Sequence, residues 1–171
     1  MTHRTRRIAG LAALALAAGP ALAFAGADPA PDANYAGETS QSKLRFEFTT
    51  SADGSQVDKL FAQYKAPHCE NADSKAQGSI RQKGLRITDG NFARKGKEVA
   101  TLKPQGGFAG GKQIERFSIR GHFVSQELAR GSLNVKVTIK SKSGSVISTC
   151  VHNKPISWSA DRLGVGPEIE E

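Results

Sequence analysis

The chain is poor in cysteine and in aromatic residues. Only two of its 171 residues are cysteine, and aromatic residues make up 6%. Two cysteines cannot build a four-thiolate zinc centre or a disulfide-dense scaffold. Few aromatic residues argue against a surface that stacks nucleobases, so we expect no nucleic-acid partner. The composition, with 38% hydrophobic and 23% charged residues, is typical of one soluble globular domain.

The first 27 residues have the three parts of a secretory signal peptide. A basic start precedes an apolar run over residues 8–18, and a stretch of small residues follows. The A-x-A pattern of this stretch allows cleavage after Ala23, Ala25 or Ala27. We therefore expect a secreted, extracytoplasmic protein with no membrane span in its mature form.

Charge is distributed unevenly along the mature chain. Residues 35–160 contain 20 Lys and Arg against 10 Asp and Glu, whereas both ends are acidic. The sequence therefore predicts four parts: a signal peptide over residues 1–27, a disordered segment over 28–34, a β-domain over 35–162 and an acidic tail over 163–171.

The two cysteines, Cys69 and Cys150, form an even pair in a chain expected to reach an oxidising compartment. This favours one disulfide, and it is not the C-x-x-C spacing of a redox motif. In the chain-entropy model, closing a loop of about 80 residues contributes roughly 4.5 kcal/mol. The predicted role of the bridge is therefore structural.

Apolar residues recur at every second position over most of the mature chain, most clearly in residues 133–139. Groups of turn-forming residues, such as 52–55 and 88–91, separate these runs. A period of two indicates strands with one buried face, joined by hairpins. The sequence predicts an all-β fold, a single antiparallel β-sandwich of roughly eight to ten strands, with a closed β-barrel as the alternative.

Residues 55–66 fit two different periods. Val57, Leu60 and Tyr64 have helical spacing, whereas Leu60, Ala62 and Tyr64 fit one face of a strand. We favour a strand because the neighbouring segments are strands.

Several short motifs follow one another in a fixed order: Tyr35-x-Gly37-x-Thr39-Ser40-Gln41, Cys69, Gly121-x-Phe123, Ala129-x-Gly131-x-Leu133, Cys150 and Trp158-x-Ala160. In this order they resemble an uncharacterised family of small secreted bacterial β-rich domains. The resemblance covers nearly the whole mature chain. It implies an all-β fold, paired cysteines and secretion, and it implies no activity or site residue, because none is known for that family.

Two patterns that resemble known sites are poor matches to them. Residues 106–112 fit the G-x-x-x-x-G-K pattern of a phosphate-binding loop, but Gln113 stands where that loop needs Ser or Thr. His68 and His152 flank the cysteines, but we expect the two rings on opposite faces, with no third ligand nearby. We predict no metal site and no cofactor.

Candidate catalytic groups are equally poorly defined. Glycoside hydrolysis needs two carboxylates held in one cleft, and nothing in the spacing of Glu38, Glu47, Glu115 and Glu127 selects two of them. Trp158 lies at a position of the alternating pattern that we expect to face the core, so we interpret it as a core residue rather than as a sugar-stacking platform. The sequence predicts no catalytic residue and no enzyme.

The candidate binding residues lie in two basic clusters. These are Arg81, Lys83 and Arg86 in the first, and Arg94, Lys95 and Lys97 in the second. Such clusters can hold a polyanion by charge alone. We therefore expect a secreted, non-catalytic module whose partner is an anionic polysaccharide or cell-envelope polymer. A β-barrel that holds a small apolar ligand, or a secreted hydrolase, remains the alternative.

Overall fold

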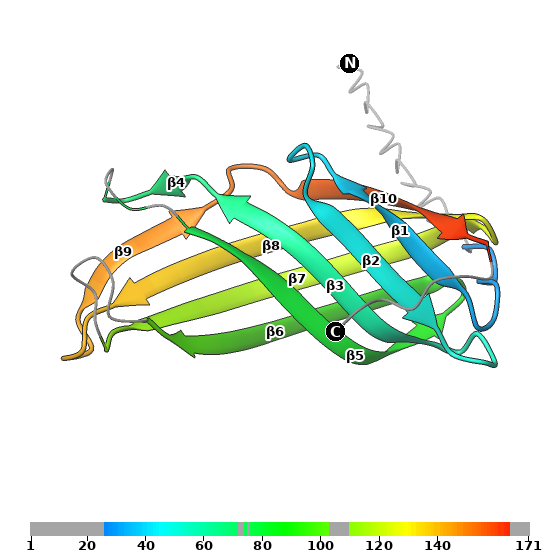
Figure 1. Cartoon of the computed structure of the whole chain (residues 1–171), viewed down its shortest axis with the longest axis horizontal. Coiled ribbons are helices and arrows are strands. Elements are labelled where there is room, and N and C mark those ends of the chain that lie inside the picture. The colour runs from blue at the N-terminus through cyan, green and yellow to red at the C-terminus, as the bar shows by residue number, and fades with distance from the viewer. Residues whose placement is uncertain (1–25, 72–73, 75, 103–109, 165–171) are drawn as a thin grey trace, which may run out of the picture.

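The computed structural model of the chain describes residues 26–71, 74, 76–102 and 110–164. That part contains β-strands and no helix, so no helix in it could span a membrane (Figure 1). The strands are β1 (Asn34–Thr39), β2 (Arg45–Thr50), β3 (Gln56–Ala66), β4 (His68–Cys69), β5 (Ala76–Thr88), β6 (Asn91–Thr101), β7 (Lys112–Ser125), β8 (Leu128–Lys140), β9 (Val146–Val151) and β10 (Ile156–Leu163). The all-β prediction is confirmed.

The strands form one antiparallel sheet in the order β10-β1-β2-β3-β5-β6-β7-β8-β9-β4, and β10 also pairs with β8. The sheet therefore folds back on itself. Pairing between β5 and β6 is limited to two residue pairs, Ile87–Phe92 and Thr88–Asn91. Figure 1 accordingly shows β1, β2, β3 and β5 as a front layer and β6, β7, β8 and β9 as a back layer. This is the predicted antiparallel sandwich rather than a clean barrel.

The line along which β5 and β6 part is named the seam below. Beyond the two pairs at the hairpin, residues 76–86 of β5 pair only with β3, and residues 93–101 of β6 pair only with β7. Within the described part of the chain, each of these stretches therefore has one edge without a neighbouring strand. The seam separates the front layer from the back layer on this side of the molecule.

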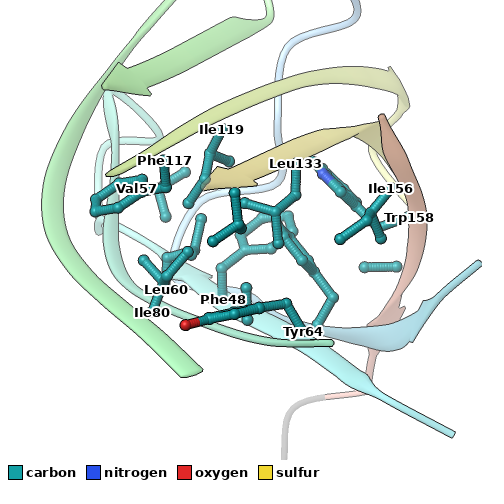
Figure 2. Close-up of a cluster of buried hydrophobic side chains, with 14 of the residues drawn as sticks. Phe48, Val57, Leu60, Tyr64, Ile80, Phe117, Ile119, Leu133, Ile156 and Trp158 are labelled. Carbon is teal, nitrogen blue, oxygen red and sulfur yellow. The ribbon is translucent and has the colours of Figure 1, made fainter. Parts of the chain in front are cut away.

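The core lies between the two layers and is rich in stacked rings. The Trp158 ring stacks on Phe46 with centroids 3.9 Å apart, and Tyr35 stacks on Phe48 at 4.6 Å. Figure 2 shows Phe48 and Trp158 packed in one cluster with Leu133 of the back layer. Trp158 is only 3% exposed, which confirms that it belongs to the core.

The segment that fits both periods is a strand, β3, as favoured above. Its register with β2 shifts between Thr49 and Thr50, and Asp58 is the extra residue of the resulting bulge. A bulge moves the inward phase by one residue. Val57 and Leu60 are therefore both buried although they lie three residues apart, and this produces the spacing that resembles a helix.

The predicted disulfide is present. Cys69 and Cys150 lie directly opposite each other in the β4–β9 pair and are bonded through their sulfur atoms. β4 contains two residues and pairs only with β9. The bond therefore attaches the end of the front-layer strand β3 and its extension β4 to the back layer.

The segment before β1 differs from the expected disordered stretch over 28–34. Ala30 and Ala33 are buried, at 2% and 5% exposure, and the Thr50 hydroxyl donates to the Ala30 carbonyl at 2.7 Å. The Ala27 amide also donates to the Phe123 carbonyl at 2.8 Å. The segment is ordered because its alanines cover the end of the core. The predicted signal peptide and acidic tail fall mainly on residues 1–25 and 165–171, which lie outside the described residues.

Candidate functional site

The two basic clusters predicted from the sequence lie on different layers. All six side chains are exposed: Arg81, Lys83, Arg86, Arg94, Lys95 and Lys97. The first three belong to β5 in the front layer and the last three to β6 in the back layer, and the seam lies between them. The two clusters therefore lie on either side of the seam, where the backbones of β5 and β6 do not pair. Within the second cluster, Arg94 lies on the same side of β6 as the buried Phe92, the side that faces the other layer. Lys95 and Lys97 lie on the opposite side and face outward.

The outward face of β6, β7 and β8 collects basic side chains from all three strands. Its Lys and Arg residues are Lys95, Lys97, Lys112, Arg116, Arg120, Arg130, Lys136 and Lys140. This surface is named the back basic face below. No Asp or Glu occupies an outward position of these strands, because Glu98 and Glu115 have the inward phase.

The strand register places these cations opposite one another. Lys97 pairs with Arg116, which in turn pairs with Lys136. Like charges at directly opposite positions destabilise a sheet. Among the described residues, the salt bridges are Arg45–Glu47 and Arg162–Glu127, and neither involves the back basic face. The cations of this face are therefore available to an external anion.

One end of the back basic face is hollowed. A shallow depression of about 470 Å³ lies between the ends of β6, β7, β8 and β10. Its lining residues are Asn91, Arg120, Gly121, His122, Arg130, Gly131, Ser132, Ser157 and Trp158. The lining combines two guanidinium groups with an imidazole, hydroxyls and an amide, and it contains no carboxylate. Such a donor set suits an anionic group carried on a hydroxylated or phosphorylated unit.

The floor of this hollow consists of backbone, because two glycines lie opposite each other in the β7–β8 pair. A Cβ at Gly131 would lie 2.0 Å from the Arg120 carbonyl oxygen and 2.3 Å from the Trp158 ring. A Cβ at Gly121 would lie 2.3 Å from the Phe92 ring. The two aromatic rings therefore lie directly beneath the glycine backbone. The glycines add no side chain to the floor of the hollow, and the side chains of the other lining residues surround it.

The outward face of the front layer has a different character. Glu47 lies among its cations and forms an ion pair with Arg45, which raises the pKa of the guanidinium through a hydrogen bond and opposite charge. Arg81 lies over the Phe61 ring, 4.9 Å from its centroid, and Arg45 lies over the same ring at 5.8 Å. Arg45 and Arg81 therefore already have partners within the chain.

The histidines beside the disulfide are closer together than expected. The rings of His68 and His152 lie 6.3 Å apart, edge to face, rather than on opposite faces. The expectation failed because β9 ends at Val151, so His152 lies beyond the strand and does not keep its alternation. In the part of the chain that the structure describes, no group of three or more His, Cys, Asp or Glu side chains could hold a metal ion.

The other sequence motifs contribute little to a site. Most of the glycine-rich pattern at 106–112 lies outside the described residues, and Lys112 already belongs to strand β7 rather than to a helix. Of the four carboxylates considered for hydrolysis, Glu115 is buried between the layers. Glu127 is paired with Arg162, and Glu47 with Arg45. His122 is exposed and lines the hollow.

Sequence reasoning missed most of the back basic face. Arg116, Arg120, Arg130 and Lys136 each have no other Lys or Arg within three positions, so they form no cluster along the chain. The sequence did indicate that these side chains face outward, because each lies at a polar position in a run where apolar residues recur at every second position. Pairing of the runs, which the sequence does not specify, is what brings them together.

Comparison of the chain with models of protein families, with curated proteins and with solved structures finds no match.

Proposed function

We propose that the protein is an extracytoplasmic, non-catalytic module that binds an anionic polymer of the cell envelope or matrix through the back basic face. The observation that carries this proposal is the row of directly opposed cations, Lys97, Arg116 and Lys136, without a carboxylate at the outward positions around it. The signal-like first 27 residues and the disulfide support a location outside the cytoplasm.

The geometry of the face suits a long anion. Neighbouring strands lie about 4.8 Å apart, and outward residues along one strand repeat at about 6.7 Å. The cations therefore form a grid on which a polymer with regularly spaced phosphate, sulfate or carboxylate groups can make several contacts at once. The hollow at Arg120 and Arg130 would receive one repeat unit at the end of this track.

The alternative functions have less support. The space between the layers contains stacked rings, such as Phe46 with Trp158, which leaves less room for an apolar ligand. The hollow contains no carboxylate for acid and base catalysis.

The salt dependence of binding tests the proposal. We expect labelled dextran sulfate, polyphosphate or polygalacturonate to bind the purified protein, with affinity that falls linearly in a plot of log Kd against log salt, because binding releases counterions. Fluorescence anisotropy at increasing NaCl concentrations measures this slope, with uncharged dextran as the control. Equal binding of uncharged dextran, or a slope near zero, would contradict the proposal.

A further inference from the structure

The polar side chains around the hollow form two rows that cross the strands. Within each row, neighbouring residues are directly opposite each other in the strand register. The first row runs from β6 across β7 to β8, and the second runs from β7 across β8 to β10. In this order the rows consist of Asn91, His122 and Arg130, and of Arg120, Ser132 and Ser157. Each of these side chains can donate a hydrogen bond, so donors from four strands surround the hollow.

The two guanidinium groups of the hollow come from different rows. Arg120 of β7 lies opposite Ser132 of β8, and Arg130 lies two residues before Ser132, so the arginines are diagonal neighbours. Diagonal positions on one face of an antiparallel pair lie about 7 to 8 Å apart. Both side chains are exposed, and no salt bridge among the described residues involves either of them. One anion between the rows can therefore contact both guanidinium groups.

Small residues leave the space between and beside the rows open. Gly121 and Gly131 lie opposite each other between the rows, and Ser132 and Ser157 fill little of the second row. The hollow has a volume of about 470 Å³, which lies in the range of about 300 to 1,000 Å³ for small-molecule sites. A single sugar unit that carries one anionic group fits a space of this size.

The chemistry of the lining favours one kind of anionic group. A carboxylate has two oxygens in one plane and matches a single guanidinium fork, whereas a phosphate ester presents three acceptor oxygens that can meet donors of both rows. A phosphomonoester carries a charge of about −1.5 to −2 at neutral pH, more than the single charge of a carboxylate or a sulfate ester. It therefore gains most from two guanidinium groups in a hollow that contains no carboxylate.

We propose that the hollow is a binding site for a phosphomonoester carried on a sugar, with the phosphate held between Arg120 and Arg130. The hydroxyls of Ser132 and Ser157 supply hydrogen bonds to the sugar. This inference rests on the proposed function for the polymer that carries the group. A phosphomonoester occurs at a chain end or on a side substituent, so the hollow selects polymers that are phosphorylated there. The rest of the back basic face contributes charge without this selection.

Binding of glucose 6-phosphate tests the hollow in the absence of a polymer. At neutral pH and about 150 mM NaCl, we expect saturable binding with Kd on the order of 10⁻⁴ to 10⁻³ M, because the ligand is small and the hollow is open. Amide NMR of the ¹⁵N-labelled protein measures this Kd, and the largest shifts should fall at Gly121, Gly131 and Ser132. Glucose 6-sulfate, glucuronate and inorganic phosphate should each bind at least about fivefold more weakly, and glucose should not bind.

Substitutions of single arginines assign the binding. Arg120→Gln and Arg130→Gln should each weaken glucose 6-phosphate binding about tenfold, because each removes charge-assisted hydrogen bonds. Arg86→Gln is the matched control, since it removes an exposed guanidinium of the front layer, and it should keep the Kd within about twofold. Unchanged binding in both hollow variants, NMR shifts spread over the whole back basic face, or equal affinity for glucose 6-sulfate would overturn the proposal.

Labelled dextran sulfate, measured on the same protein, separates this inference from the proposed function. Salt-dependent binding of dextran sulfate without saturable binding of glucose 6-phosphate would overturn the assignment of the hollow and leave polymer binding in place. Saturable binding of glucose 6-phosphate at the hollow without any binding of dextran sulfate or polyphosphate would support the phosphomonoester site and contradict the proposed function.

Discussion

Replacing Cys69 and Cys150 together with alanine will lower the free energy of unfolding by about 4.5 kcal/mol. The two cysteines are 81 residues apart, so the bond closes a long loop and restricts the unfolded chain strongly. Apart from the bond, this corner is held by two residue pairs between β4 and β9 and by hydrogen bonds from the amides of Glu70 and Asn71 to Thr149 and Ser148. A loss of this size is a large fraction of the stability of an ordinary domain, about 5 to 15 kcal/mol.

Urea unfolding followed by far-UV circular dichroism measures this difference. Alanine is preferred to serine because Cys150 is fully buried, and a serine hydroxyl there would add a cost of its own. The reduced wild-type protein provides the control, since it should unfold at nearly the same urea concentration as the double variant. A loss below about 1 kcal/mol would show that the native contacts, and not the bond, hold β4 in place.

Trp158→Ala will cost about 3 to 5 kcal/mol, the range for removing a large buried aromatic side chain. Trp158 stacks on Phe46 at 3.9 Å and contacts the rings of Phe48 and Phe92, at 6.2 and 6.0 Å between centroids. It lies on β10, the strand that pairs with both β1 and β8 and so joins the two layers. The cavity left by its removal therefore falls where the layers are linked.

Trp158→Phe is the matched control for this prediction. It keeps a ring against Phe46, and it also removes the indole nitrogen, which is buried without a hydrogen-bond partner. We expect the phenylalanine variant to lose clearly less stability than the alanine variant. Because Trp158 is the single tryptophan, circular dichroism rather than fluorescence should follow unfolding. Equal losses in the two variants would contradict the role assigned to the ring stack.

The parts of the fold that were predictable are those set by local alternation. Leu133, Val137 and Ile139 alternate with polar residues in the sequence and are buried in β8. Interruptions of the alternation were harder to interpret, because the bulge at Asp58 turns a strand pattern into one that also fits a helix. The ordered segment around Ala30 was missed because its burial depends on the end of the core and not on its own sequence.

The candidate sites depended on information that the sequence does not contain. Residues adjacent in a strand point to opposite faces, so a run such as Arg94-Lys95 is divided between them. Residues far apart in the sequence, such as Lys97, Arg116 and Lys136, meet only through the register of β6, β7 and β8. The two rows of side chains around the hollow have the same origin.

The most direct test of the polyanion proposal compares two triple variants with the same change in charge. One carries Lys97→Glu, Arg116→Glu and Lys136→Glu on the back basic face, and the other carries Arg81→Glu, Lys83→Glu and Arg86→Glu on the front layer. The measurement is the Kd of each folded variant for labelled dextran sulfate at one moderate salt concentration. We expect the back variant to bind more than about tenfold more weakly than the wild-type protein, and the front variant to remain within about threefold of it. Equal losses in both variants, or a larger loss in the front variant, would contradict the assignment of binding to the back basic face.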